Sequence, residues 1–214
     1  MFKNRIDAGE RLAKKLGQYQ GRDTVVLALP RGGVVIGYEV ARALKIPLDI
    51  VVTRKIGHPD NPEYAICVVD EKGSLLCNEA EVKTIDQAWF KEEILRQKRE
   101  AERRTALYRG KRKMVKIADK VVIIVDDGIA TGFTMRLAVR SVKMQNPKKI
   151  IVAVPVAPTE SLQELKSEGA DEIVVLEPPE EFMGAVGVHY LDFGQVEDDE
   201  VINILQKSGG LAEW

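Results

Sequence analysis

The stretch VVIIVDDGIATGFT, residues 121–134, says most about the fold of this 214-residue chain. Its first five residues form an apolar, β-branched run, which is typical of a strand buried on both faces of a parallel sheet. Asp126 and Asp127 follow where that strand ends, and open α/β sheets bind their ligands at this edge. The glycine-containing turn at 128–132 runs into a helix and can direct backbone N–H groups at a phosphate. The stretch therefore predicts an α/β protein with a ligand site at the carboxyl edge of its sheet.

The residues on either side extend the same pattern. An amphipathic helix opens the chain at 5–16, and a strand at 24–29, the turn PRGG and a helix at 34–44 precede a further strand at 48–53. After the central stretch come strands at 148–156 and 171–176, with a helix at 159–167 between them. Strands that alternate with helices predict a mostly parallel central sheet flanked by helices, built from right-handed crossovers.

Residues 54–119 interrupt this alternation, and we interpret them as an insertion in a single domain spanning 1–214. The insertion begins with a turn-rich segment, continues as a hairpin around residues 71–73, and ends in a charged helix from Thr84 to about Arg109. Thr84 and Gln87 form the capping box expected at that helix start. The pairs Glu92–Arg96 and Glu100–Arg104 add i,i+4 support.

The hairpin places Cys67 and Cys77 opposite each other across its strands. A disulfide between them is geometrically allowed, but reduced thiols are favoured in a cytosolic protein. Two cysteines are too few for a disulfide scaffold or a four-thiolate zinc site.

Charge and hydropathy narrow the range of partners. The formal net charge is −1, which argues against a bulk polyanion binder. No apolar run approaches the ~20 residues of a membrane helix, so we expect a cytoplasmic protein with no membrane partner. Residues 91–113 carry ten Lys or Arg against four Asp or Glu, whereas residues 160–200 carry thirteen acids against one lysine. Because acids interrupt the basic run, we interpret it as a structural arm rather than a nucleic-acid interface.

The turn and the two aspartates suit different parts of one ligand. Carboxylates repel a phosphate, but they accept hydrogen bonds from sugar hydroxyls and can bind Mg²⁺. Thr131 and Thr134 add hydroxyl donors to the turn. A phosphate site beside two carboxylates therefore indicates a sugar phosphate.

The segment 125–134 closely resembles the phosphoribosyl diphosphate (PRPP) motif of the type I phosphoribosyltransferases. ALPRGG at 28–33 is similar to the diphosphate loop of that family, and TRKIGHPDNP at 53–62 resembles the start of its flexible catalytic loop. The resemblance implies the type I phosphoribosyltransferase fold with a small hood, for which residues 177–200 are the candidate. It covers residues 24–53 and 121–156, so the role of the charged helix is not carried over.

The resemblance also implies the transfer of a 5-phosphoribosyl group from PRPP to a nitrogenous base, with Mg²⁺ and release of diphosphate. The expected catalytic set is Arg31, Arg54, Lys55, Asp126 and Asp127. The expected PRPP-binding set contains these residues except Arg54, together with Gly32, Gly33, Gly128, Ile129, Ala130, Thr131, Gly132 and Thr134. The two aspartates fix the ribose and are the candidate metal residues, directly, through water or through the ribose. Tyr190, Asp192 and Phe193 are the candidate base-binding residues.

Two positions depart from the family pattern. Ala130 stands where members acting on 6-oxopurines carry an aspartate, which puts hypoxanthine and guanine in doubt unless Asp192 or His189 supplies the acid–base group. Gly128 replaces the usual bulky aliphatic residue. Two other functions stay open, a non-catalytic regulator that binds PRPP or a nucleotide and contacts nucleic acid, and a PRPP hydrolase. The oligomeric state also stays open, with a homodimer as one option.

Overall fold

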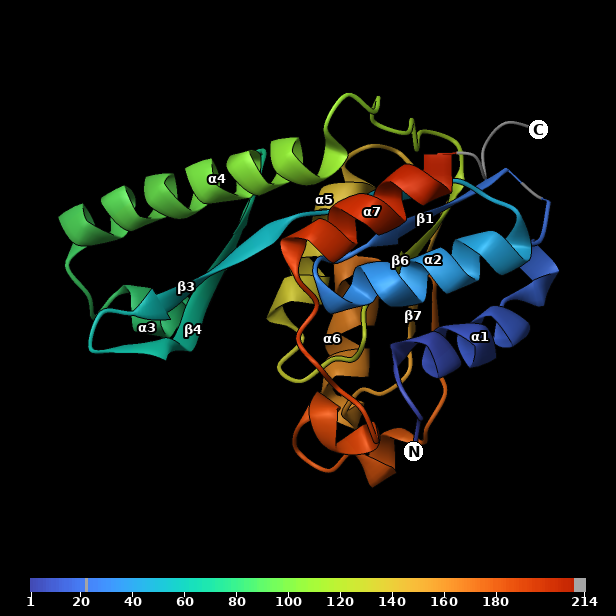
Figure 1. The fold of residues 1–214 in the computed structure, drawn as a ribbon. Helices are drawn as coiled ribbons and strands as arrows, with labels where there is room; N and C mark the ends of the chain where they lie inside the picture. Colours follow the sequence, from blue (N-terminus) through green and yellow to red (C-terminus); the bar gives the residue numbers. More distant parts are fainter. Residues whose placement is uncertain (22, 210–214) are drawn as a thin grey trace.

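The structure is a computed structural model that describes residues 1–21 and 23–209 (Figure 1). Its centre is a five-stranded sheet in the order β2-β1-β6-β7-β8, in which every neighbouring pair is parallel. The strands are β1 (Thr24–Ala28), β2 (Leu48–Ile50), β6 (Val121–Val125), β7 (Lys149–Val154) and β8 (Glu172–Val175). This confirms the mostly parallel α/β fold predicted from the apolar runs.

Helices cover both faces of the sheet, as such doubly buried strands require. On one face, alternate strand residues such as Val26 and Ile123 pack against α1, α2 and α7. On the other face, Val25 and Ile124 pack against α5 and α6. These helices are α1 (Arg5–Lys15), α2 (Gly32–Leu44), α5 (Phe133–Lys143), α6 (Thr159–Glu168) and α7 (Asp198–Ser208), with short 3₁₀ turns at Gly17–Tyr19, Pro179–Glu181 and Val186–His189. No helix in the described ranges has both the length and the apolar composition needed to cross a bilayer.

Residues 53–109 form an arm that projects from the body of the molecule (Figure 1). The arm holds a separate antiparallel sheet in the order β3-β4-β5 and has its own apolar cluster around Ile56, Ile66 and Phe90. Its elements are β3 (Thr53–His58), β4 (Asn61–Asp70), β5 (Leu75–Cys77), α3 (Glu79–Val82) and α4 (Gln87–Arg109). The hairpin predicted around residues 71–73 is present, with Gly73 at φ 89°.

Four local predictions in this region are wrong. The segment 53–62, expected as a turn-rich loop, forms the strand β3 and the start of β4, and β2 ends at Ile50 rather than at residue 53. Helix α4 begins at Gln87 because Asp86 is its N-cap and accepts from the Trp89 N–H at 2.7 Å, so Thr84 does not cap it. Arg96 pairs with Glu93 rather than with Glu92, because Glu93 lies on the buried side of the helix. The Glu100–Arg104 pair is confirmed.

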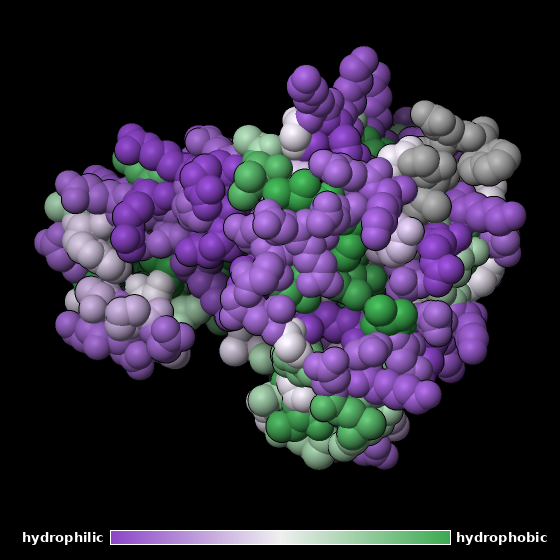
Figure 2. All heavy atoms as spheres, in the orientation of Figure 1, coloured by the Kyte–Doolittle hydropathy of each residue, from purple (hydrophilic) through white to green (hydrophobic). Residues whose placement is uncertain are grey.

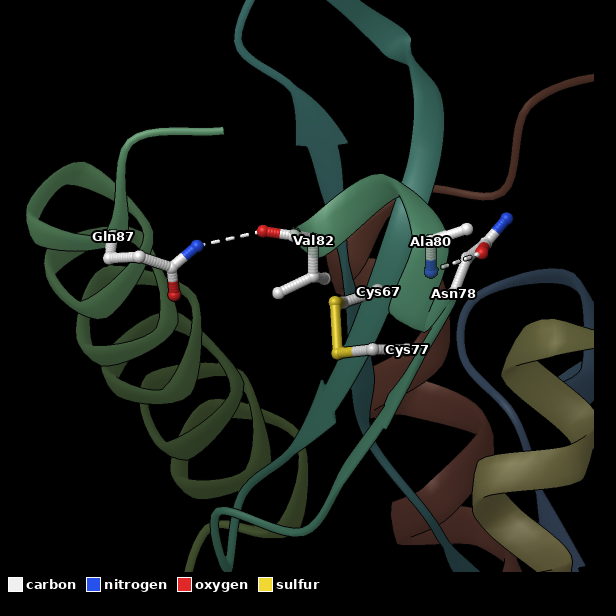
Figure 3. Close-up of a disulfide and its surroundings, with 6 residues drawn as sticks. All are labelled: Cys67, Cys77, Asn78, Ala80, Val82 and Gln87. Carbon is white, nitrogen blue, oxygen red and sulfur yellow. Dashed lines mark hydrogen bonds between the residues drawn. A yellow bond between two sulfur atoms is a disulfide. The ribbon is translucent and has the colours of Figure 1, made fainter. Parts of the chain in front are cut away.

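Cys67 and Cys77 form a disulfide, which corrects the expectation of reduced thiols (Figure 3). The physical reason is register: Cys67 is the direct antiparallel partner of Cys77, and their Cα atoms are 4.1 Å apart. The bond lies between the arm sheet and α3, close to Val82 (Figure 3).

A buried hydrogen bond attaches the arm to the body. Ser141 of α5 donates to the Asp70 carboxylate at 2.6 Å, and Asp70 itself is fully buried. The other carboxylate oxygen of Asp70 accepts from the backbone of the hairpin turn, at Lys72 and Ser74. This one side chain therefore fixes both the turn and the position of the arm on α5.

Helix α2 lies unusually close to the sheet at Gly37. A Cβ atom there would stand 2.9 Å from the Cβ of Ala28 and 3.1 Å from side-chain atoms of Leu48 and Val125. This close approach brings the start of α2 to the carboxyl edge of β1 and β6.

We therefore expect Gly37→Val to lower the free energy of unfolding by about 1–3 kcal/mol, the usual cost of overpacking a core. Gly17→Val is the control, because a Cβ atom at Gly17 meets nothing within 4 Å. Thermal denaturation of both variants checks the prediction, which fails if the two melt at the same temperature.

Candidate functional site

The candidate site lies at the carboxyl edge of β1 and β6, where open parallel sheets bind ligands. A cavity of about 210 Å³ opens there. Its lining comes from the turn after β6, the start of α5, β3 of the arm and the hood (residues 177–200): Lys55, Asp126, Gly128, Ile129, Ala130, Thr131, Gly132, Thr134, Met135 and Val186. The structure thus brings the turn residues, Asp126 and Lys55 together.

The turn 128–132 leads directly into α5. Gly132 precedes that helix at φ 75°, a left-handed conformation that disfavours residues with a side chain. The first N–H groups of a helix have no intrahelical acceptor and carry the positive end of its dipole. The turn therefore has the geometry of a phosphate-binding loop.

The structure explains why residue 128 is glycine. A Cβ atom there would lie 2.5 Å from Cγ1 of Val186 and 2.8 Å from Cγ2 of Val156. The hood therefore packs on the turn only because position 128 has no side chain.

The two aspartates differ in their surroundings. Asp126 lines the cavity, and its Oδ1 accepts the backbone N–H of Asp127 at 2.8 Å. Desolvation, followed by repulsion from the Asp127 carboxylate, raises the pKa of Asp126 well above its ordinary value. The site therefore holds a carboxyl group that is costly to ionise without a further donor or cation.

Asp127 is held by a cation that the sequence did not reveal. Arg5 donates from Nε to its Oδ2 at 2.7 Å and from Nη1 to the Gly194 carbonyl at 2.7 Å. The Arg5 guanidinium also lies 3.8 Å from the ring centre of Phe193. The sequence signal was an ordinary amphipathic helix, in which Arg5 could not be told from a surface charge.

The PRGG loop packs against the same two aspartates. A Cβ atom on Gly32 would overlap the Asp127 carboxylate, and one on Gly33 would lie 2.9 Å from Asp126 Cα. Both glycines are therefore needed for this approach, whatever ligand the loop binds. The Pro30–Arg31 peptide is cis, and Arg31 lies 3.3 Å from Glu197.

Arg54 and Lys55 point to opposite sides of β3. Lys55 lines the cavity, whereas Arg54 donates to Gln97 of α4 at 3.1 Å. Burial, followed by the nearby Arg104 charge, lowers the pKa of Arg54. Strand alternation thus corrects the expectation that both side chains reach the site.

The hood residues lie differently from the prediction. Tyr190 is 6% exposed, packs between Phe2 and Phe193, and donates to the Asp127 carbonyl at 2.6 Å. Its ring is therefore not an open surface for stacking a base, and burial raises its pKa. Asp192 is exposed and accepts from Gly194 at 3.3 Å. The hood residue that lines the cavity is Val186, which the sequence prediction missed.

His189 cannot replace the missing loop carboxylate in this arrangement. It is 1% exposed, its Nδ1 lies 2.6 Å from Glu177, and its Nε2 accepts from the Met183 N–H at 3.1 Å.

Apolar side chains gather on the surface of the hood, which is the lower lobe in Figure 2, where Met183, Val188 and Leu191 are exposed.

The residues at the site fit a magnesium ion that is bound mainly by its ligand. In the described part of the chain, no three His, Cys, Asp or Glu side chains are grouped as a metal site. Mg²⁺ commonly uses one or two carboxylates together with substrate phosphates and water. Asp126, with Asp127 beside it, could supply such a carboxylate.

The protein thus has a parallel α/β sheet, with a turn that leads into a helix and paired carboxylates at the edge where such sheets bind ligands. The sequence profile of the phosphoribosyl transferase domain matches residues 2–192. The chain belongs to this phosphoribosyl transferase family.

Individual relatives agree with this assignment. Proteins of two Mycobacterium tuberculosis strains, each named provisionally as a phosphoribosyl transferase, are 38% identical over 210 residues, covering 97% of this chain. The chain spans about half, 47%, of the length of these curated relatives. The crystal structure of TT1426 from Thermus thermophilus matches with a TM-score of 0.80 at 42% identity, over 97% of this chain and 98% of that one.

We expect Asp126→Asn to stabilise the metal-free protein at neutral pH. A carboxyl whose pKa is raised by folding makes the folded protein less stable as the pH rises from the unfolded pKa, about 3.9, to the folded pKa. An amide at the same position does not titrate and so does not cause this loss. The gain in melting temperature should therefore grow as the pH rises from about 4.5 and level off above the folded pKa. Each 1 kcal/mol is worth about 2–4 °C in a chain of this size.

Asp60→Asn is the matched control, because the Asp60 side chain is 91% exposed. Thermal melts of the two variants are recorded in chelator-containing buffer between about pH 4.5 and 8. In this range the folded and unfolded states of the unaltered chain bind different numbers of protons. A gain from Asp126→Asn that shrinks with rising pH would contradict the assigned direction of the shift.

Proposed function

We propose that the protein transfers the 5-phosphoribosyl group of PRPP to a nitrogenous base and releases diphosphate. The observation that carries this proposal is the cavity that joins the turn 128–134 to the Asp126 carboxyl and the Lys55 ammonium. A phosphate binder, a hydroxyl acceptor and a cation within one cavity match the three parts of PRPP.

Each group has a role in this proposal. The turn 128–134 holds the 5-phosphate through backbone N–H groups and the hydroxyls of Thr131 and Thr134. Asp126 accepts hydrogen bonds from ribose hydroxyls, while Asp127, fixed by Arg5, supports that position. Lys55, with Arg31 and the backbone of Gly32 and Gly33, faces the diphosphate.

The reaction is a displacement at C1 of the ribose. A ring nitrogen of the base forms the new bond as the C1–O bond to diphosphate breaks, the electron pair leaves with the diphosphate, and the proton that the base loses passes to water. Positive charge develops on the ribose and negative charge on the leaving group, so the protein acts by alignment and electrostatics rather than through a covalent intermediate. Mg²⁺ would neutralise the diphosphate oxygens. Lys55, which lines the cavity, adds a positive charge beside the leaving diphosphate.

The acceptor base is proposed not to be a 6-oxopurine. Ala130 is exposed in the cavity and can neither donate nor accept a proton. The hood residue beside the cavity, Val186, is apolar, and both nitrogens of His189 are already engaged. Loss of general acid–base help commonly costs about 10²–10⁴-fold in rate.

In a competition assay with PRPP and Mg²⁺, we therefore expect neither hypoxanthine nor guanine to give the highest kcat/KM among adenine, hypoxanthine, guanine and orotate. Diphosphate release and nucleotide formation are measured together. If hypoxanthine or guanine is preferred, the inference from Ala130 is wrong. Diphosphate release without nucleotide would indicate a hydrolase, and PRPP binding without release would indicate a regulator.

The opposite orientations of Lys55 and Arg54 give a second test. Lys55→Met should weaken PRPP binding about tenfold or more, because a charge-assisted hydrogen bond contributes about 1.5–3 kcal/mol. Arg54→Met removes the same charge one residue away but should leave the affinity within about twofold, since its side chain points away from the cavity. Calorimetric titration with PRPP at constant Mg²⁺ decides, and equal losses in both variants would contradict the assigned orientation.

A further inference from the structure

Arg31, at the start of the PRGG loop, is already paired with two carboxylates. Its Nη1 lies 3.3 Å from Glu197 Oε2 and 3.6 Å from Asp198 Oδ1. The Arg31 side chain is 30% exposed, while the side chains of Glu197 and Asp198 are 66% and 39% exposed, so the pairs lie at the surface, within reach of a ligand. The cation assigned above to the diphosphate therefore has acidic partners within the protein itself.

These carboxylates belong to a segment beyond the family match. The match ends at residue 192, and the chain then runs from the hood past the start of α2 to α7 (Figure 1). Arg5 donates to the Gly194 carbonyl on the way, and α7 packs along α2. The segment that follows residue 192 thus contacts the PRGG loop from outside the residues that the family profile matches.

Both carboxylates are held in place by other residues. Tyr108 of α4 donates to Asp198 Oδ1 at 2.7 Å, and Gln195 donates to Glu197 Oε1 at 2.8 Å. Burial, together with Asp198, raises the pKa of Tyr108 to about 12, so it stays a donor. Val201 and Leu205 of α7 are fully buried and hold this helix against the body of the protein. The pairing with Arg31 is therefore set by the fold.

Helix capping does not account for Glu197. It occupies the N-cap position of α7, yet its side chain makes no capping hydrogen bond. Asp199 and Glu200 already supply negative charge to the first turn, where the helix dipole favours it. The Glu197 side chain is directed to Arg31 and Gln195 instead.

We propose that Glu197 and Asp198 form an acidic latch that competes with diphosphate for Arg31 and so sets the affinity of the site for PRPP and for released diphosphate. The inference rests on the proposed function, which assigns Arg31 to the diphosphate. A diphosphate group and two carboxylates cannot share one guanidinium without repulsion, so binding must displace or loosen the latch. The latch weakens the binding of PRPP and of diphosphate alike, and it thereby favours release of the diphosphate product.

The test is a calorimetric titration with inorganic diphosphate at fixed Mg²⁺, using the full chain. The double variant Glu197→Gln, Asp198→Asn should bind diphosphate about threefold to tenfold more tightly than the unaltered chain, because partly exposed ion pairs each contribute only modestly. The KM for PRPP should fall by a similar factor. Asp199→Asn is the control, because it removes a charge from the same helical turn at a residue that does not pair with Arg31. This variant should leave the affinity for diphosphate unchanged.

Arg31→Met separates the inference from the proposed function. If diphosphate binding depends on Arg31 but is equal or weaker in the double variant, the latch is overturned and the proposed function stands. If the unaltered chain and the double variant both fail to bind diphosphate, the latch and the assignment of Arg31 fall together. Thermal melts confirm that each variant is folded.

Discussion

Two adjacent carboxyl groups at the end of a buried strand impose the constraint on which the rest of the site depends. Burial raises the cost of ionising Asp126, and the neighbouring charge of Asp127 adds to it. The protein compensates only one of them: Arg5 neutralises Asp127, while Asp126 faces the cavity with a raised pKa. This asymmetry explains why the first helix and the hood must meet at the carboxyl edge of β6.

Several distant segments converge to hold Asp127. Arg5 binds its carboxylate, Tyr190 binds its carbonyl, and Gly32 allows the PRGG loop to pack against its side chain. The ring of Phe193 in turn lies against Arg5. Arg5 from the first helix and Tyr190 and Phe193 from the hood therefore support one aspartate. None of these three residues lines the cavity at the turn.

The sequence predicted what is encoded locally. Apolar runs marked the central strands, and the pattern of acids, glycines and threonines at 126–134 marked the turn, because both depend on neighbouring residues. Arg5 was missed because its partner lies 122 positions away. Arg54 was misplaced because the segment that proved to be β3 was expected to be a loop, and adjacent residues of a strand point to opposite faces. Thr84 was misplaced because Asp86 fits the same capping rule. The facing of Cys67 and Cys77 followed from the predicted hairpin, but the 4.1 Å separation of their Cα atoms could not be predicted from the sequence.

The unfavourable desolvation of Asp126 also explains why an arginine like Arg5 would not suit the cavity side of the pair. A cation placed against Asp126 would stabilise the empty protein, but it would occupy the position where a ligand must bring its own donor or metal ion. In the proposed function, ribose hydroxyls and Mg²⁺ supply the missing partner. Such a partner would stabilise the ionised form of Asp126, whose burial the empty protein leaves without a cation of its own.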